Sequence, residues 1–219
     1  MPLPLPRPPV AIIFDFDGVI LDSTRLKHQA FFTLYADEDP AKLKEMAHHD
    51  RIHGGVTRRV KIAHFEKHLF GRAGDPQSVE TLAMRYRDLV FDAVTACRFV
   101  PGAKELLEKG LGKIDMHLVS GTPLDELKVI VEGRGLTKYF KSIQGGPVLK
   151  PEAFANIMAK HGYEPSRTLA VGDAMTERDV AVALGIPFLA IGVDGDHVFP
   201  DDDIRVPHLE GADEMIGIA

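Results

Sequence analysis

A short apolar run at residues 10–14 ends in two closely spaced carboxylates, Asp15 and Asp17, which are followed by Gly18. Its β-branched and aromatic residues suit a strand that is buried on both faces of a parallel sheet. Ligands of such sheets bind at the carboxyl ends of the strands, and Gly18 permits a sharp turn there. This stretch predicts an α/β fold with a functional site at the two aspartates, although a solvated Asp-Gly turn would explain it equally well alone.

The composition is that of a globular protein with a sizeable core. The 219 residues suffice for one large domain or two modest ones, and no apolar run is long enough to span a membrane. Residues 1–9 are Pro-rich and predict a flexible tail rather than a signal peptide. Because Cys97 is the single cysteine, no intrachain disulfide can form, and we expect a cytoplasmic protein.

The charge balance bears on the kind of partner. A formal net charge of -6 argues against nucleic acid and favours a small metabolite. Nothing in the sequence distinguishes a monomer from a homodimer.

The block at residues 22–97 differs from the rest of the chain in the spacing of its apolar residues. Four stretches in it have the apolar spacing of helices and none has that of a convincing strand: residues 25–36, 40–49, 56–70 and 76–94. We therefore predict an all-α domain at 22–97, inserted into a core domain made of residues 10–21 and 98–219.

Beyond this insertion, strand and helix patterns alternate. Strands are predicted at residues 116–119, 140–143, 169–172 and 187–191, and helices at 101–108, 124–132 and 152–161, with a further helix ending at Leu184. Such alternation predicts a doubly wound, right-handed parallel sheet. Residues 192–208 read as an irregular acidic segment.

Counted with the strand at residues 10–14 as the first, the first four strands are each followed by polar residues. Ser120 and Gly121 come after the second strand, Lys150 after the third, and Asp173, with Glu177 four residues later, after the fourth. Since the carboxyl ends of parallel strands share one edge, we expect all of them to lie near Asp15.

The four stretches, in this order, resemble the motifs of the haloacid dehalogenase superfamily of phosphohydrolases. The match spans residues 10–192 and is similar to the branch that contains phosphoglycolate phosphatases and β-phosphoglucomutases. The resemblance implies a Rossmann-like core, an α-helical cap at 22–97 and a phosphatase that uses Mg²⁺. One departure is that Glu177 stands where the fourth motif usually has an Asp, with Asp179 two residues further on as the alternative acid.

The chemistry of a phosphatase gives each acid a role. A carboxylate such as Asp15 can attack a phosphate ester, and a second carboxyl, Asp17, can protonate the leaving group and activate water. Each pair of negative charges at about 4 Å costs about 4 kcal/mol at an effective dielectric near 20, so a cation is needed, and Mg²⁺ suits carboxylates and phosphate oxygens. The resemblance implies Asp15, Asp173 and the backbone carbonyl of Asp17 as metal ligands, with Glu177 acting through a water.

The remaining motif residues are expected to hold the phosphate. Lys150 supplies a second cation, and Ser120 followed by backbone N–H groups at a helix N-terminus forms an anion site. Gly121 and Phe16 are included as phosphate-binding positions by the resemblance. Taken alone, Lys150 would read as a solvated loop lysine and Ser120 as a helix cap.

Two features of the helical block are candidate sites. Arg58 lies in the first turn of a helix that follows two glycines, where a cation opposes the helix macrodipole and favours a bound anion, so it is a candidate substrate contact. A solvated basic face explains it equally well. His64 and His68 have the spacing of metal ligands on a helix, but Glu66 does not complete the His-Glu-x-x-His pattern, and the sequence alone does not favour a histidine metal site.

The same motifs are compatible with other functions. A phosphomutase would pass the phosphoryl group to a second sugar hydroxyl, and a phosphonatase would need a Schiff-base lysine such as Lys42, Lys44 or Lys61. A phospho-receiver module is disfavoured by the helical insertion, and dehalogenase chemistry by Asp17 and Asp173. The acidic loop at residues 194–203 lacks the spacing of a calcium loop.

Overall fold

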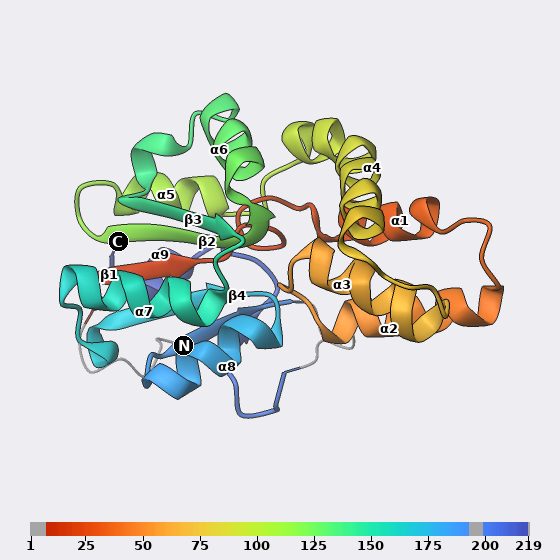
Figure 1. The fold of residues 1–219 in the computed structure, drawn as a ribbon. Helices are drawn as coiled ribbons and strands as arrows, with labels where there is room; N and C mark the ends of the chain where they lie inside the picture. The colour runs from red at the N-terminus through yellow and green to blue at the C-terminus, as the bar shows by residue number, and fades with distance from the viewer. Residues whose placement is uncertain (1–7, 193–198, 219) are drawn as a thin grey trace.

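The computed structural model describes residues 8–192 and 199–218, which form a parallel sheet with helices on both sides (Figure 1). Within these residues the sheet has six strands in the order β3-β2-β1-β4-β5-β6, and every neighbouring pair is parallel. The strands are β1 (Ala11–Phe14), β2 (Asp115–Pro123), β3 (Ser142–Gly146), β4 (Thr168–Gly172), β5 (Phe188–Ile191) and β6 (Arg205–Val206). The predicted doubly wound parallel sheet is confirmed.

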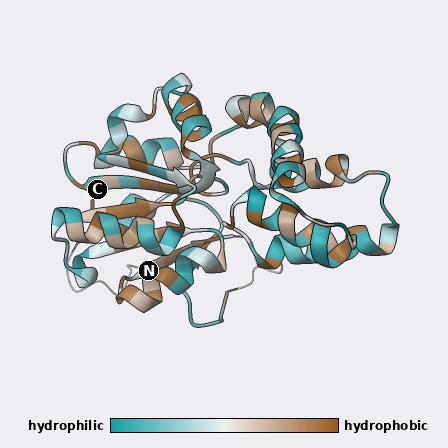
Figure 2. Ribbon diagram, in the orientation of Figure 1, coloured by the Kyte–Doolittle hydropathy of each residue, from teal (hydrophilic) through white to brown (hydrophobic). Residues whose placement is uncertain are grey.

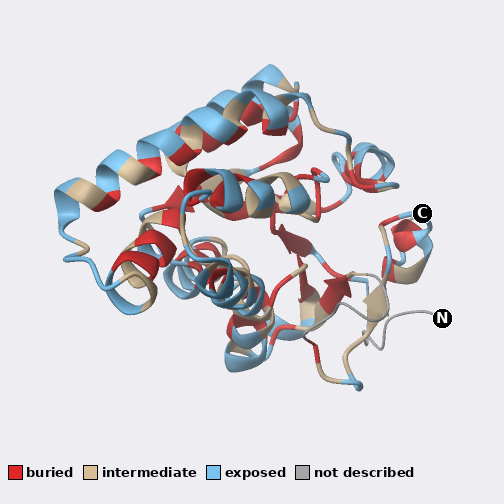
Figure 3. Cartoon of the chain, turned by 90° about the vertical axis from the view of Figure 1, so that its right-hand side faces the viewer, coloured by how far each residue is buried: buried red, intermediate tan, exposed pale blue. Residues whose placement is uncertain are grey.

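Alternate residues of β1 face the two helical layers. Ile12 and Phe14 belong to one apolar cluster and Ile13 to the other, and all three are fully buried. The first cluster includes side chains of α5 (Ala103–Gly110), α6 (Leu124–Gly133) and α9 (Ala212–Ile216), and the second those of α7 (Lys150–His161) and α8 (Met175–Leu184). The strands are therefore hydrophobic and buried between helices whose outer sides are exposed (Figures 2 and 3).

Strand β1 lies between β2 and β4 in the sheet and is in parallel register with both. Phe14, its last residue, pairs with Leu118 on β2 and with Val171 on β4. The residues that follow these strands therefore emerge at one edge of the sheet, as in other open α/β sheets.

The other helices gather beside this edge (Figure 1). They are α1 (Thr24–Leu34), α2 (Pro40–Ile52), α3 (Arg58–His64) and α4 (Pro76–Ala96), and a π-helical turn η1 (Phe65–Leu69) continues α3. Asp39 and Asp75 cap α2 and α4 with their carboxylates, and a proline stands at the first helical position of each. Aromatic rings from three elements, Phe31, Phe65 and Tyr86, pack together inside the group.

The chain enters and leaves the helical group through two paired segments. The N–H of Asp22 donates to the carbonyl of Arg98 (2.9 Å), and the N–H of Val100 donates to the carbonyl of Ile20 (3.0 Å). All four residues lie within three positions of the predicted boundaries between core and insertion, which fall after residues 21 and 97. The division into two domains stays a prediction.

Several boundaries differ from the predicted ones. Helix α7 begins at Lys150 rather than at 152, and β2 runs on to Pro123 with an irregular register after Val119. The segment predicted as irregular contains the short strand β6, and α9 was not predicted. Residues 193–198 of the acidic loop and residues 1–7 of the Pro-rich tail lie outside the described residues. Among the described helices, none is long and apolar enough to cross a bilayer.

Candidate active site

Polar residues from four separate parts of the chain meet at the carboxyl edge of the sheet. Asp15 directly follows β1, and its N–H donates to the carbonyl of Val171 on β4 (2.9 Å). Asp173 directly follows β4, Lys150 opens α7, and Ser120 lies in the last part of β2. The structure thus brings the predicted motif residues together.

Three acids form a cluster around one lysine. Asp15, Asp173 and Glu177 each place a carboxylate oxygen within 4.8 Å of the others. The Nζ atom of Lys150 lies 3.1 Å from Oδ1 of Asp15 and contacts Oε1 of Glu177. Thr24 donates its hydroxyl to Oδ2 of Asp173 at 3.0 Å. Because one ammonium group faces three carboxylates, the cluster has an excess of negative charge when all are ionised.

The pKa values of two of these acids reflect that crowding. Burial raises the pKa of Asp15 above its usual value, although the charge of Lys150 opposes the shift. Burial, followed by repulsion from Asp15, raises the pKa of Asp173 to about 7. A bound cation would lower both pKa values, since it stabilises the ionised forms.

This cluster fits a hard divalent cation. Its potential ligands are carboxylate oxygens, the donors that Mg²⁺ prefers. Oδ1 of Asp15 is buried and lies 3.1 Å from Nζ of Lys150 without a well-aligned hydrogen bond, so the carboxylate keeps coordination capacity for a metal beside its ion pair with the lysine.

Asp17 has a different environment from Asp15. Its carboxylate accepts hydrogen bonds from Ser23 (2.6 Å), Lys27 (2.5 Å) and Thr122 (3.2 Å), and a long one from Ser120 (3.4 Å). Burial raises the pKa of Asp17, but the charge of Lys27 and these hydrogen bonds outweigh it and hold the pKa below its usual value. Sequence reasoning missed Lys27, Ser23 and Thr122. Only the hydroxyl of Thr122, close behind Ser120, offered a local clue.

Ser120 does not stand at a helix N-terminus as expected. It lies within β2, and α6 starts four residues later. Its hydroxyl instead accepts the N–H of Thr122 (3.1 Å), which orders the end of the strand. At Gly121 a Cβ atom would lie 2.6 Å from the carbonyl oxygen of Gly55, so the helical group approaches the sheet edge closely here.

The loop before α3 covers the acidic cluster. The carbonyl of Gly54 accepts the hydroxyl of Thr176 at 2.8 Å. Gly55 has φ +74°, and a Cβ atom on it would lie 2.7 Å from Nζ of Lys150 and collide with oxygens of Thr176 and Glu177. Only glycine fits this position, and the loop seals one side of the cluster.

The two acids considered for the fourth motif lie in different surroundings. Glu177 is buried, and its Oε2 accepts the N–H of Ala174 at 3.1 Å, which closes the first turn of α8. The side chain of Asp179 is 66% exposed and lies 3.8 Å from Arg178. Glu177 and not Asp179 belongs to the acidic cluster.

Arg58 meets an anion, but that anion is a side chain of the same protein. Its guanidinium donates to both carboxylate oxygens of Glu126 on α6, with the NH1 to Oε2 bond at 2.9 Å. Both side chains are less than a tenth exposed, and Nε of Arg87 lies 3.7 Å from Oε1 of Glu126.

The side chain of Phe16 is buried, and its backbone N–H hydrogen-bonds to Asp15 and lowers the pKa of that acid.

A cavity of about 780 Å³ opens between the sheet edge and the helical group. Its lining includes the carboxylates Asp15, Asp17 and Asp173 on the sheet side and the cations Arg25, Lys27, Arg51, Arg58 and Lys61 on the helical side. Lys27 pairs with Asp17, Lys61 with Asp50, and Arg58 with Glu126. In the part of the chain that the structure describes, Arg25 and Arg51 have no ion-pair partner, so the helical side of the cavity keeps positive charge for an anion.

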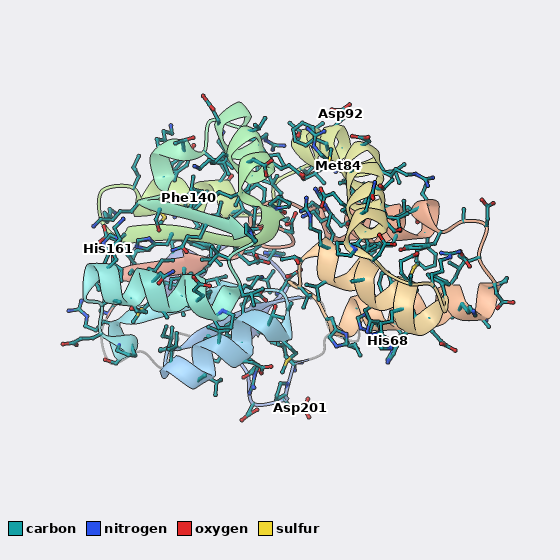
Figure 4. The ribbon with its side chains drawn as sticks, viewed as in Figure 1. His68, Met84, Asp92, Phe140, His161 and Asp201 are labelled. Carbon is teal, nitrogen blue, oxygen red and sulfur yellow. The ribbon has the colours of Figure 1, made fainter. Side chains whose placement is uncertain are left out.

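Two acids of the loop at residues 194–203 do not line this cavity. Asp203 pairs with Arg178 at 2.5 Å, while Asp201 is exposed on the surface (Figure 4). Of the three lysines named for a Schiff base, Lys61 lines the cavity but donates to Asp50, whereas Lys42 and Lys44 are exposed.

A parallel α/β sheet with an aspartate pair after its first strand, and with a lysine and further acids at the same edge, defines an enzyme that acts on anionic groups. The chain belongs to the haloacid dehalogenase-like hydrolase family, whose family model matches residues 10–185. This confirms the resemblance of the four motifs and the prediction of an enzyme.

Two curated relatives are phosphoglycolate phosphatases. That of Rhodospirillum rubrum is 28% identical over 192 residues, which cover 84% of this chain and 79% of the relative. That of Synechococcus elongatus is 26% identical over 190 residues, which cover 84% and 82% of the two chains.

Solved structures share the fold across almost the whole chain. The HAD-hydrolase YfnB of Bacillus subtilis, solved with bound magnesium, has a TM-score of 0.72 at 18% identity and covers 96% of this chain and 100% of its own. The β-phosphoglucomutase of Clostridium difficile has a TM-score of 0.74 at 17% identity and covers 95% of this chain and 97% of its own. At this identity the likeness establishes the fold and no more.

Proposed function

We propose that this enzyme is a Mg²⁺-dependent phosphatase that hydrolyses the phosphomonoester of a small metabolite through a phosphoryl group carried on Asp15. The observation that carries the proposal is the meeting of Asp15, Asp173 and Glu177 within 4.8 Å, beside Lys150 and at the wall of a large cavity. The phosphatase names of the curated relatives support it.

The reaction proceeds in two steps. In the first, a carboxylate oxygen of Asp15 forms a bond to phosphorus while the bond to the ester oxygen breaks, and Asp17 gives its proton to the departing alkoxide. In the second, Asp17 takes a proton from water, the water oxygen bonds to phosphorus, and Asp15 is released. Lys150, 3.1 Å from Asp15, offsets charge on the phosphoryl oxygens.

The contacts of Asp17 suit this double role. Lys27, Ser23 and Thr122 stabilise its carboxylate, which is the form that takes a proton from water. A phosphate dianion in the cavity competes for the ammonium group of Lys27, which also lines it, and so raises the pKa of Asp17. With this raised pKa, Asp17 holds the proton that the leaving group needs until the ester bond breaks.

The metal would be held by the carboxylates of Asp15 and Asp173 and by the backbone carbonyl of Asp17, with Glu177 acting through a water. When bound, Mg²⁺ would offset the repulsion between the phosphate and these acids. Lys150 and the N–H of Ala174 orient Glu177 toward the cluster.

Phosphoglycolate, the substrate in the names of the curated relatives, is the first candidate. It carries a carboxylate in addition to its phosphate, and Arg25 and Arg51 line the helical side of the cavity without a carboxylate partner among the described residues. We assign Arg25 and Arg51 to binding the carboxylate of the substrate. Arg58 is already paired with Glu126, and we assign it to holding α3 against α6.

The first experiment measures inorganic phosphate released from phosphoglycolate and from p-nitrophenyl phosphate, with Mg²⁺ and with excess chelator. Release should require Mg²⁺, and Asp15→Asn should abolish it for both esters. Glu177→Gln should weaken the apparent Mg²⁺ affinity about 10- to 100-fold, whereas Asp179→Asn, at an exposed acid of the same helix, should not. Activity undiminished by chelator would remove the metal from the mechanism, and an isomeric phosphate ester as product would identify a mutase.

The second experiment separates the two aspartates. Asp17→Asn should still allow attack on an aryl phosphate, whose leaving group needs little protonation, but should slow the hydrolysis of the intermediate by about 10² to 10⁴-fold. Intact mass should then show a phosphoryl adduct that maps to Asp15. An adduct on any other residue contradicts the assignment of the nucleophile.

A further inference from the structure

Four histidines meet on the helical group, away from the active site. His49 and His53 are four residues apart at the end of α2, and His64 and His68 are four residues apart across the junction of α3 and η1. Ring centroids are 3.9 Å apart for His49 and His53, 3.9 Å for His49 and His64, and 4.8 Å for His64 and His68. We call these four residues the histidine cluster.

The histidine cluster is open to solvent. His53 and His68 are exposed, and His49 and His64 are half-buried. None of the four lines the cavity at Asp15. Figure 4 places His68 at the lower edge of the helical group, on the outer side of α2 and α3. An ion could therefore reach the histidine cluster without passing the catalytic residues.

The cluster is unusual because it has so few polar partners. Nδ1 of His53 interacts with the carbonyl of His49 at 2.9 Å, whereas Nδ1 of His49 is buried and has no hydrogen-bond partner among the described residues. Burial and the neighbouring rings His53 and His64 lower the pKa of His49 to about 4, and burial with His68 and His53 lowers that of His64. At neutral pH these two rings are therefore uncharged and carry free lone pairs.

We propose that the histidine cluster is a second metal site, which binds one borderline divalent cation of the Zn²⁺ type. Imidazole nitrogen is a preferred ligand of Zn²⁺, and two histidines four residues apart on one helix face can share an ion. Here two such pairs lie against each other from successive helical segments. A shared ion would give the orphaned nitrogen of His49 a partner and would cross-link α2 to the α3–η1 segment.

Binding requires movement of side chains only. The rings of His49, His53 and His64 are stacked with interplanar angles near 20° (21° and 20°), so their nitrogens lie in successive layers and do not point at one centre. Among the described residues, only Asp15, Asp173 and Glu177 place three ligand atoms within 4.8 Å of one another. The proposal requires the exposed rings His53 and His68 to rotate about their side-chain bonds, so that their nitrogens turn toward His49 and His64. The π-helical turn that carries His68 is an element often found at functional sites.

The two sites of the chain select different metals. Oxygen ligands at Asp15, Asp173 and Glu177 suit Mg²⁺, whereas nitrogen ligands suit Zn²⁺, Ni²⁺ and Cu²⁺. Excess Mg²⁺ therefore occupies the acidic cluster and leaves the histidine cluster free. This difference separates the proposed site from the catalytic one in an experiment.

The test titrates metal-free protein with Zn²⁺, and separately with Co²⁺ as a spectroscopic probe, in the presence of excess Mg²⁺. Wild type should bind one Zn²⁺ per chain, with a visible Co²⁺ absorption that reports nitrogen ligands. Loss of a residue that only orients a metal ligand weakens metal binding about 10- to 100-fold. The double variant His64→Ala, His68→Ala loses two proposed ligands themselves, so its Zn²⁺ affinity should fall at least about tenfold. The matched control is His48→Ala, which removes an exposed histidine of α2 that contacts no ring of the described residues.

Two results overturn the proposal. One is the absence of saturable Zn²⁺ binding by wild type that circular dichroism shows to be folded. The other is equal affinity in wild type and in the double variant, checked again with His64→Gln, His68→Gln, which keeps polar side chains at both positions. Weaker binding in both double variants, with His48→Ala unchanged, supports the site whatever the substrate of the enzyme proves to be.

Discussion

Replacement of Arg58 by Met tests whether this residue holds the helical group on the core or contacts the substrate. Arg58 and Glu126 form a two-pronged ion pair, and their side chains are 8% and 9% exposed. Removal of one partner from a buried pair costs about 3–5 kcal/mol, because it leaves the other charge buried without compensation. Arg87, 3.7 Å from Glu126, offsets part of this loss. We therefore expect the free energy of unfolding to fall by about 2–4 kcal/mol.

Urea unfolding measures this loss as a lower midpoint at an unchanged slope. The double variant Arg58→Met, Glu126→Leu should recover most of it, since an apolar pair of similar volume commonly replaces a buried ion pair without loss. Arg59→Met is the matched control. Its pair with Glu80 is exposed on both sides (42% and 49%), so its removal should change the unfolding free energy by about 1 kcal/mol or less.

Kinetics then separates the two roles of Arg58. If it acts through Glu126, the double variant should recover the KM for phosphoglycolate together with the stability. An unchanged urea midpoint in Arg58→Met would refute the structural reasoning. A raised KM that persists in the double variant, with p-nitrophenyl phosphate unaffected, would identify Arg58 as the substrate contact that the sequence predicted.

Three further outcomes follow from single contacts. Lys27→Met should raise the pKa of Asp17, because the charge of Lys27 is the main effect that opposes burial, so the limb of the kcat/KM profile on which activity falls as Asp17 loses its proton should move to higher pH; an unmoved limb would contradict this. Gly55→Ala should reduce activity by about 10²-fold, as expected for misplaced catalytic groups, whereas Gly71→Ala, with a similar positive φ (+68°) but open space around it, should leave kcat unchanged. Burial lowers the pKa of His117 from 6.5 to about 4, so the unfolded state binds more protons between these values and the free energy of unfolding should fall as the pH falls through this window. The contribution of His117 should be about 3 kcal/mol, measured by chemical unfolding at pH 7 and pH 4 as the difference between the losses of wild type and of His117→Asn.

The acidic cluster of Asp15, Asp173 and Glu177 could be predicted from the sequence, because the carboxyl ends of parallel strands lie at one edge of a sheet. An apolar run at 10–14 that ends in Asp15 reads as a buried strand, and the runs before Ser120 and Asp173 read the same way. Once such strands lie parallel, the residues that follow them must meet at one edge, whatever their separation in the chain. The sequence therefore predicted that Asp15, Lys150 and Asp173 lie together, without any knowledge of contacts.

The surroundings of that cluster were decided by the tertiary structure. Lys27 reaches Asp17 from α1, Arg58 reaches Glu126 from another helix, and Gly55 covers Lys150. No periodicity marks these contacts, since each depends on how the helical group is oriented against the sheet.

The same reason explains the histidine cluster and the missed elements. The spacing of His64 and His68 was visible in the sequence, but their meeting with His49 depends on the packing of α2 against the α3–η1 segment. The elements β6 and α9 are too short to show a hydrophobic period, and they form because β5 and the sheet face give them a surface to pair with and pack on. The sequence by itself determined the strands and the acids at their ends, because both rest on local patterns. That Lys27 also faces Asp17 was decided only when α1 packed beside the edge of the sheet.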